Sequence, residues 1–331
     1  MNRTPNRSGS VRVDVTYDLP SNVVEFTAET GYLELDTVTL AASPGFDEQR
    51  DGSFEWDGDS AAPTLSFRID APGRFSSSEF AVEAEDWAFV SYPNVYVSWR
   101  YRGSAPTFRT ASTTANGGVA SSASAIDGTA NASSRTIRGV NLTVVSSPET
   151  TPAASVDAYA SLYAVGLREL AGIDREALTT FVVSPDGVDT DSLAAGAEQG
   201  GDFWVQGRYS GIDYVGNTPA HEFVHTRMGS FGDGSSRWLT EASAEYYGYL
   251  LTTNTGGGTW SEFREALRVR DAQYREATLT NPSTWDGGTF QRAPYRKGAL
   301  VLAALDAEIA NRTGGVRSLQ DVFAYRFDDD Q

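Results

Sequence analysis

His221-Glu222-Phe223-Val224-His225 contains the only two histidines of the chain, four residues apart, with a glutamate directly after the first. In an α-helix, side chains four residues apart lie on one face, about one turn from each other. Two imidazoles placed in this way can bind one zinc ion, and the glutamate between them can accept a proton from a water that the metal activates. The stretch therefore predicts a zinc-binding helix with His221 and His225 as ligands and Glu222 as general base. The alternative is a helix surface with two unrelated histidines.

A third zinc ligand has to come from elsewhere in the chain, because catalytic zinc usually has three protein ligands and keeps a fourth position for water. The chain has no cysteine and no further histidine, so this ligand has to be a carboxylate. The best candidate is Glu241, which follows Trp238-Leu239-Thr240 and lies sixteen residues after His225, beyond a turn rich in Gly and Ser at 229–236. A helix–turn–helix of that length can bring Glu241 to the metal. The alternative is an ordinary glutamate that faces solvent.

Glu245 follows Glu241 by four residues and therefore shares its helix face. A metal-bound imidazole usually donates its other N–H to a carboxylate, which fixes the tautomer and the ring orientation. We therefore expect Glu245 to accept this hydrogen bond from His221. The competing interpretation is a surface carboxylate that pairs with an arginine.

Three ordered motifs carry a resemblance to a known family. HEFVH at 221–225 and WLTEASAEYYG at 238–248 resemble the gluzincin metallopeptidases, the thermolysin-like class. The run PYRKGAL at 294–300 is similar to the aminopeptidase-N-like and glycyl-aminopeptidase-like branches. In those branches the tyrosine of the last motif stabilises the tetrahedral oxyanion, so the resemblance implies that role for Tyr295. It covers residues 155–325 and implies one Zn²⁺ per chain.

Two features depart from the pattern of aminopeptidase-N relatives. The spacing between His225 and Glu241 is a little shorter, and the strand that grips the substrate amine with a glutamate is not reproduced at 198–204. Glu198 or Asp202 are the residues there that could serve instead. The strand near Phe203 is expected to bind the substrate backbone as an added strand. Exopeptidase and endopeptidase activity both stay open at this point.

The pattern of apolar residues predicts an α+β protein of two domains. Residues 1–150 alternate apolar and polar side chains between turn clusters, which favours an antiparallel β-sandwich. Within them, the Ser/Ala/Gly-rich segment 103–138 is expected to form an exposed loop or hairpin. Residues 151–331 are expected to form a mainly helical, thermolysin-like zinc peptidase domain with a small sheet. In this part, Pro219 near the start of the HEFVH helix and the run 298–310 favour helices.

The charge of the chain is strongly negative. It has 44 acidic and 26 basic residues, a net charge of −18, and Lys297 as its only lysine. Such a surface repels nucleic acids and anionic membranes, so we expect neither as a partner. Acidic excess with few lysines resembles haloarchaeal proteins, in which surface carboxylates keep a protein hydrated in concentrated salt. The alternative is a merely acidic protein.

The sequence therefore predicts a zinc metallopeptidase that cleaves a peptide or protein substrate, with an aminopeptidase as one form of it. The alternatives are a catalytically inactive peptidase fold used for binding, and an endopeptidase or other amide hydrolase with the same site. No run of eighteen apolar residues could span a membrane, and the first residues lead into no apolar segment of a signal peptide. We therefore expect a cytoplasmic protein, whose oligomeric state the sequence does not indicate.

Overall fold

The structure is a computed structural model of the 331-residue chain. It describes residues 2–3, 9–31, 36–191, 193–232, 234–268, 274, 276–285 and 290–328. The chain forms two compact units. Unit 1 comprises residues 1–131, 147–149 and 183–194, and unit 2 comprises residues 132–146, 150–182 and 195–331. The chain passes between the two units several times, so the units are not separated at one position of the sequence. A domain boundary at residue 150 stays a prediction.

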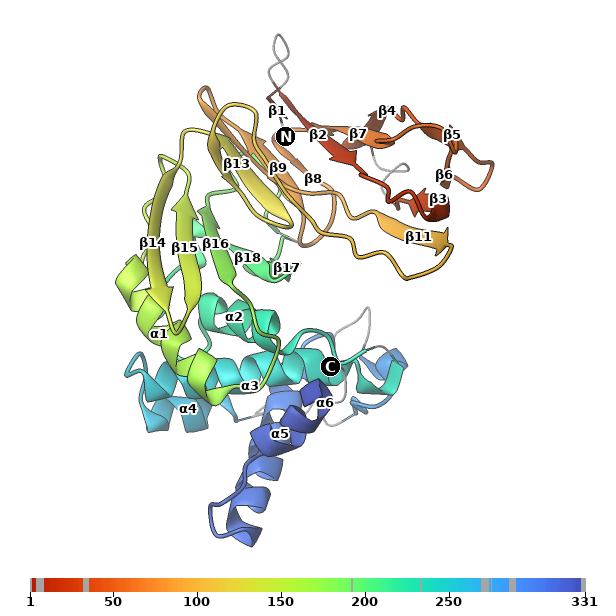
Figure 1. Cartoon of the computed structure of the whole chain (residues 1–331). Helices are drawn as coiled ribbons and strands as arrows, with labels where there is room; N and C mark the ends of the chain where they lie inside the picture. Colours follow the sequence, from red (N-terminus) through yellow and green to blue (C-terminus); the bar gives the residue numbers. More distant parts are fainter. Residues whose placement is uncertain are drawn as a thin grey trace. The chain divides into compact units, whose positions relative to one another are not determined.

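Unit 1 is built from three antiparallel sheets, whereas the sequence predicts one two-sheet sandwich (Figure 1). The first sheet has the order β1-β2-β7-β4 (Asn2–Arg3, Ser10–Thr16, Thr64–Asp70, Val38–Ala42). The second has the order β11-β3-β6-β5 (Tyr96–Tyr101, Val23–Glu29, Phe54–Trp56, Phe46–Glu48). The third has the order β12-β13-β10-β9-β8 (Gly118–Ala120, Ser124–Gly128, Trp87–Ser91, Phe80–Glu83, Gly73–Arg74). All three sheets contribute to one hydrophobic core around Phe26, Phe67 and Val90.

The segment 103–138 contains a hairpin, one of the two forms expected from its composition, but part of it is buried rather than exposed. Strands β12 and β13 form an antiparallel hairpin there, and β14 (Asn131–Ile137) begins in the same segment. β13 also pairs with β10, and its Ala125 and Ile126 are fully buried. Small side chains can fill a central strand where the neighbouring layer comes close, so a low content of large apolar residues does not exclude a buried strand.

Unit 2 contains a five-stranded sheet of order β14-β15-β16-β18-β17. The remaining strands are β15 (Val140–Ser146), β16 (Ala177–Val183), β18 (Asp202–Gln206) and β17 (Gly196–Gln199). β15 and β16 are parallel, and α1 (Val156–Glu169) makes the crossover that a parallel pair requires. β17 and β18 are antiparallel, and β17 is the last strand on its side of the sheet.

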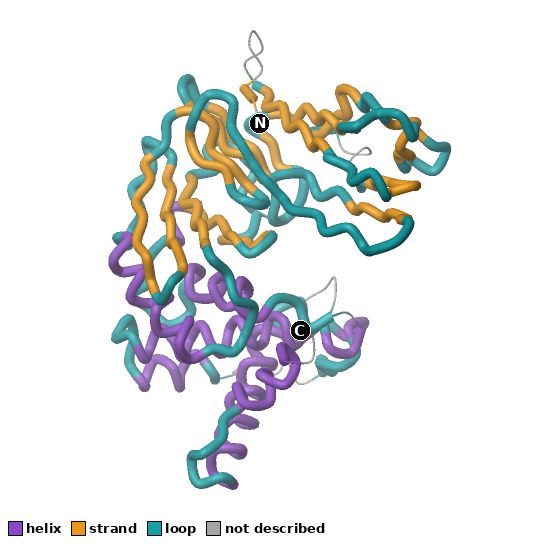
Figure 2. Tube along the Cα trace, in the orientation of Figure 1, coloured by secondary structure: helices purple, strands orange, loops and turns teal. Residues whose placement is uncertain are grey.

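All α-helices of the described chain belong to unit 2 (Figure 2). After α1 they are α2 (Thr218–Met228), α3 (Trp238–Asn254), α4 (Trp260–Ala266), α5 (Ala293–Arg312) and α6 (Leu319–Asp328). Short 3-10 turns lie at Gly207–Tyr209, Gly234–Ser236 and Pro282–Thr284. Helix α2 packs between α3 and the β17–β18 edge of the sheet, and α3 packs against α5.

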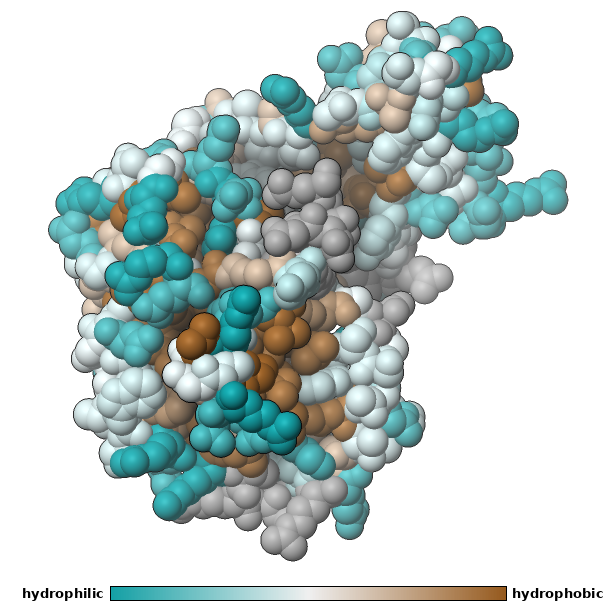
Figure 3. Space-filling view, turned by 60° about the horizontal axis from the view of Figure 1, so that its bottom comes forward, coloured by the Kyte–Doolittle hydropathy of each residue, from teal (hydrophilic) through white to brown (hydrophobic). Residues whose placement is uncertain are grey.

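Helix α5 is apolar on more than the face that it buries. Ala299 and Leu302 lie in the core, while Leu300, Val301 and Leu305 are about 40–45% exposed. Figure 3 shows brown apolar side chains at the surface among polar ones. Among the described residues, no helix has both the length and the apolar content needed to cross a membrane.

Candidate metal and active site

Helix α2 begins where its sequence favours a helix start. Asn217 is the N-cap, and its side-chain oxygen accepts a hydrogen bond from the Ala220 N–H at 2.9 Å. Pro219 stands in the first turn, where its missing N–H leaves no hydrogen bond unmade. The side-chain amide of Asn217 also donates to Thr252 Oγ1 of α3 at 2.8 Å. The N-cap therefore ties the start of α2 to α3 as well.

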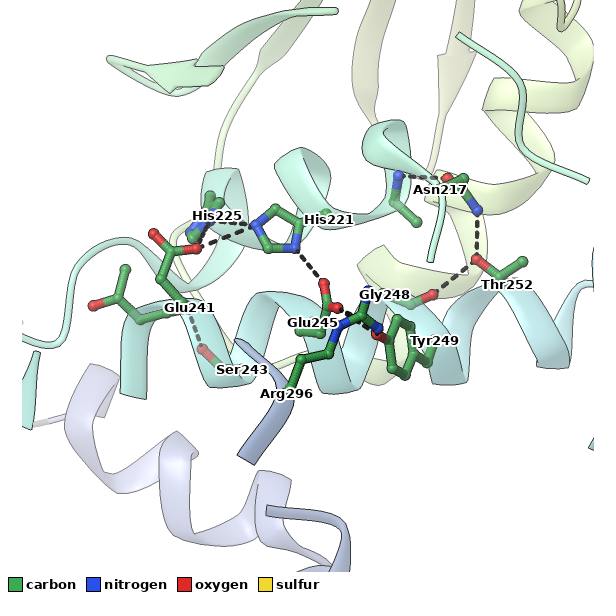
Figure 4. Close-up of polar contacts among 12 residues, drawn as sticks. Asn217, His221, His225, Glu241, Ser243, Glu245, Gly248, Tyr249, Thr252 and Arg296 are labelled. Carbon is green, nitrogen blue, oxygen red and sulfur yellow. Dashed lines mark hydrogen bonds and ion pairs between the residues drawn. The ribbon is translucent and has the colours of Figure 1, made fainter. Parts of the chain in front are cut away.

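A glycine lets α3 approach α2 closely enough for its carboxylates to reach the histidines. A Cβ at Gly248 would lie 3.3 Å from the backbone nitrogen of His221 and 3.4 Å from its Cα. These distances are shorter than those of most Cβ contacts, so the close crossing of the helices favours glycine at this position. Glu241 and Glu245 precede Gly248 on α3 and face α2 (Figure 4).

His221, His225 and Glu241 form the one cluster of potential metal ligands found among the described residues. One ligand atom from each lies within 4.8 Å of the others. The two histidine Nε2 atoms are 3.1 Å apart, and Glu241 Oε2 lies 3.3 Å from Nε2 of His221 and 3.4 Å from Nε2 of His225. The three residues that the sequence analysis nominated as ligands thus converge on one point, from two helices.

The environment of Glu241 fits a metal ion. Its Oε2 is buried and makes no hydrogen bond with the described residues. Buried polar atoms nearly always have a partner, and a metal ion would provide one here. Burial would raise the pKa of Glu241, but its interactions with His221 and His225 hold it well below the ordinary value. An ionised carboxylate beside two imidazoles is a ligand set that zinc commonly takes.

The pKa of His221 is raised. Burial opposes the charged form, but the close contacts with the carboxylates of Glu241 and Glu245 hold the pKa of His221 well above its ordinary value. Glu245 Oε2 lies 3.3 Å from His221 Nδ1, which is the nitrogen turned away from His225. The contact is the one that the sequence analysis expected for Glu245. Glu245 also lies 3.4 Å from the Nη1 atom of Arg296, so the competing arginine pairing occurs as well.

Glu222 is almost completely buried, with 7% of its surface exposed. Burial raises the pKa of Glu222 above its ordinary value, although the neighbouring histidines act in the opposite direction. Its Oε2 accepts a hydrogen bond of 2.9 Å from the backbone N–H of Glu198 in β17. This bond fixes the carboxylate at the free edge of the sheet, next to the histidine pair.

Tyr295 lies in the first turn of α5, beside the cluster. Its ring is nearly parallel to the His221 imidazole, with ring centroids 5.7 Å apart. Burial and the carboxylate of Glu241 raise the pKa of Tyr295, so the phenol keeps its proton at neutral pH. The residue nominated as oxyanion donor is therefore a neutral hydroxyl group next to the potential ligands.

The two candidates for the substrate amine differ in position. Asp202 Oδ1 accepts the Thr179 N–H at 2.6 Å and so takes part in the sheet. Glu198 lies on the edge strand β17, and its Oε1 accepts the Gly201 N–H at 2.6 Å. The expectation that the strand around Phe203 binds a peptide is wrong. That strand, β18, lies between β16 and β17, so it has no free edge for a further strand.

Two residues of this region were not nominated from the sequence. Tyr249 donates a short hydrogen bond to Glu245 Oε1, and Arg296 donates to Tyr249 Oη at 2.6 Å. Tyr249 stands four residues after Glu245, a spacing that could have indicated the pair. Nothing in the local sequence places Arg296 beside α3, because that contact depends on how α5 packs.

No protein-family model and no curated protein matches the sequence. Solved structures do resemble the fold. An aminopeptidase N family protein from Idiomarina loihiensis matches with a TM-score of 0.60 and 12% identity, over 98% of this chain and 68% of that one. A mutant M1 zinc metallopeptidase from Deinococcus radiodurans, bound to a Tyr-Ser-Ala substrate, matches with a TM-score of 0.52 and 12% identity, over 93% of this chain and 81% of that one. Another structure of an M1 zinc metallopeptidase from Deinococcus radiodurans matches with a TM-score of 0.51 and 13% identity, over 92% of this chain and 80% of that one.

The fold is that of the M1 zinc metallopeptidases. At these identities the likeness concerns the arrangement of sheets and helices. The M1-like fold of this chain places its histidine pair on α2 and its two site glutamates on α3.

Proposed function

We propose that the chain is a zinc-dependent metallopeptidase that binds one Zn²⁺ through His221, His225 and Glu241. The observation that carries the proposal is the convergence of these three ligand groups within an M1-like fold, around a buried Glu241 oxygen that makes no hydrogen bond with the described residues. When bound, zinc would supply a Lewis acid that activates water and polarises the peptide carbonyl group. The aminopeptidase form and a haloarchaeal source are finer parts of the same proposal.

Glu222 would act as the general base. It would take a proton from the attacking water and deliver it to the departing amine. Its raised pKa suits this role, because a base whose pKa approaches the working pH can both accept and release the proton. The hydrogen bond from the Glu198 N–H keeps the carboxylate in place during both transfers.

Tyr295 would stabilise the oxyanion that forms as water adds to the carbonyl group. Its protonated hydroxyl can donate a hydrogen bond to the developing negative charge. Removal of one such donor typically lowers the rate by about 10²–10³. Glu245, in contact with His221 Nδ1, would hold that imidazole so that its Nε2 faces the metal.

The free edge of β17 is where we propose that the substrate backbone binds as an added strand. This replaces the strand around Phe203. Glu198 belongs to the same edge, and its carboxylate is a candidate for binding a free amino terminus. Asp202 is less suited, since it lies on the inner strand β18 and its carboxylate accepts an N–H of the neighbouring strand β16, whereas Glu198 lies on the edge strand β17. An aminopeptidase is therefore the preferred form of the proposal, with an endopeptidase or other amide hydrolase as the alternative.

A Glu222→Gln variant tests the mechanism. We expect it to bind one zinc per chain and to lose about 10²–10⁴ of its peptidase rate, because the amide cannot accept the proton. Zinc content is measured by atomic emission. The cleavage rate is measured on two matched peptides, one with a free and one with an acetylated amino terminus. Faster cleavage of the free peptide supports the aminopeptidase form, and equal cleavage supports the endopeptidase.

Glu308→Gln is the matched control, since Glu308 is an exposed glutamate of α5 that pairs with Arg312. It should behave like the wild type. A Glu222→Gln protein that holds zinc and still cleaves at the wild-type rate would show that the base is wrongly assigned. A wild-type protein that takes up no zinc would favour the catalytically inactive binding module.

A further inference from the structure

Behind Glu245 lies a hydrogen-bonded group that the proposed mechanism does not use. The Tyr249 hydroxyl donates to Glu245 Oε1, and the Arg296 Nη1 atom contacts both that hydroxyl group, at 2.6 Å, and Glu245 Oε1, at 3.4 Å. Glu245 Oε2 faces His221 Nδ1 at 3.3 Å. Figure 4 shows the resulting chain from Arg296 and Tyr249 through Glu245 to His221.

We propose that Arg296 and Tyr249 are positioning residues, which hold the Glu245 carboxylate in the orientation that presents His221 Nε2 to the metal. The inference rests on the proposed function, because it requires zinc at His221. It assigns a role to two side chains that contact Glu245 and each other.

The burial of this group argues for more than an incidental ion pair. Exposed ion pairs contribute little, but the Glu245 side chain is only 13% exposed and Tyr249 only 1%. A buried carboxylate needs several hydrogen-bond partners, and each partner also restricts its rotation. Oε1 accepts a hydrogen bond from Tyr249 and forms an ion pair with Arg296, so Oε2 is left for the His221 imidazole.

The group also joins the two elements that carry the site. Glu245 and Tyr249 are four residues apart on α3, so they lie on one helix face. Arg296 directly follows Tyr295 in the first turn of α5. The Arg296 contact therefore links the helix that carries the proposed oxyanion donor to the carboxylate that orients a proposed zinc ligand.

Two variants of the full-length protein test the proposal, Tyr249→Phe and Arg296→Met. We expect each to weaken zinc binding about tenfold, the lower end of the range for loss of an outer partner of a metal ligand. The dissociation constant of Zn²⁺ is measured by competition with a chelator. Co²⁺ absorption spectra report whether the ligand geometry changes. Arg296→Lys, which keeps a donor cation, should recover part of the affinity.

Matched controls separate positioning from stability. Tyr246→Phe removes a tyrosine–carboxylate hydrogen bond of 2.5 Å from the same helix, and Arg312→Met removes an exposed arginine from α5. Both should keep the wild-type zinc affinity. In a Glu245→Gln background, Tyr249→Phe and Arg296→Met should have little further effect, because their influence passes through that carboxylate.

The outcomes are distinguishable. Wild-type zinc affinity in both Tyr249→Phe and Arg296→Met would overturn the positioning role, and so would effects that persist undiminished without the Glu245 carboxylate. If Tyr249→Phe does not fold, the half-exposed Arg296 still decides the question. A wild-type protein that binds no zinc, or whose zinc binding survives His221→Ala, would instead refute the proposed metal site itself.

Discussion

At His221, a proton and the proposed zinc ion would compete for the same nitrogen. Burial opposes the charged imidazole, but the carboxylates of Glu241 and Glu245 hold the pKa of His221 well above its ordinary value. Zinc requires the neutral imidazole, so binding has to release that proton. The two glutamates that favour the proton are also the groups that would bind and orient the metal complex.

We therefore predict that zinc uptake at pH 7.5 releases about one proton from His221. Titration calorimetry in buffers of different ionisation enthalpy gives the number of protons from the slope of the apparent enthalpy. Zinc affinity should fall as the pH falls, because more of the protein then carries the competing proton. Glu245→Gln should release fewer protons, since one of the groups that raise the pKa is lost. Release of no proton at this pH would contradict the raised pKa.

The same shift predicts the pH dependence of stability without metal. A raised pKa in the folded state contributes stability that is complete below the unfolded value, about 6.5. The contribution is lost as the pH rises through the folded pKa of His221. Zinc-loaded protein should not show this loss, because the metal has replaced the proton.

At the scale of elements, the packing of α5 on α3 decides where Tyr295 and Arg296 lie. Gly298 makes this packing possible. A Cβ at this position would lie 2.6 Å from the Ala242 Cβ and 3.3 Å from the Trp238 ring. Ala242 directly follows Glu241, and Gly298 lies on the same helix as Tyr295. A displacement of α5 at this contact would therefore change the distance between Tyr295 and the potential metal ligands His221, His225 and Glu241.

Gly298→Ala tests the importance of this contact. Alanine gains about 1 kcal/mol in helix propensity, but overpacking typically costs about 1–3 kcal/mol. We expect a net loss of about 1 kcal/mol in the free energy of unfolding, measured with urea, and a lower peptidase rate. Ala304→Leu adds a larger side chain at an exposed position of the same helix and should change neither quantity. Equal or greater stability of Gly298→Ala would show that the helices separate without cost.

The helices of the site were more predictable than the strands. Pro219 and the spacing of the histidines mark α2 directly in the sequence, and the run 298–310 falls within α5. Strand order could not be predicted in this way. The short apolar run at Phe203 indicates a buried strand but does not tell which strand occupies the sheet edge, because pairing joins residues that are distant along the chain.

At the scale of the whole molecule, the net charge of −18 is the dominant property. Like charges on a folded surface repel each other, and this repulsion lowers the stability of the compact state. Salt screens it, since the Debye length falls from about 10 Å at 0.1 M to about 3 Å at 1 M. A protein adapted to concentrated salt would depend on such screening.

We predict that the melting temperature rises as KCl increases from 0.1 M to 1 M, as measured by differential scanning fluorimetry. A variant with Asp18→Lys and Glu48→Lys, both exposed, changes the net charge from −18 to −14, two units for each reversal. Its melting temperature should depend less on salt. A melting temperature that is constant or falls over this range would refute a stabilising effect of screening.

The sequence by itself indicated the chemistry of the proposed site. With two histidines and no cysteine, a zinc site had to use both histidines and a carboxylate, and helical spacing placed the histidines on one face of their helix and Glu241 and Glu245 on one face of theirs. Only the tertiary structure decided which of the described strands lies at the sheet edge, how β13 is buried, and that Tyr249 and Arg296 contact Glu245. Helical periodicity is a local property, whereas these contacts join residues far apart along the chain and form only when the elements pack.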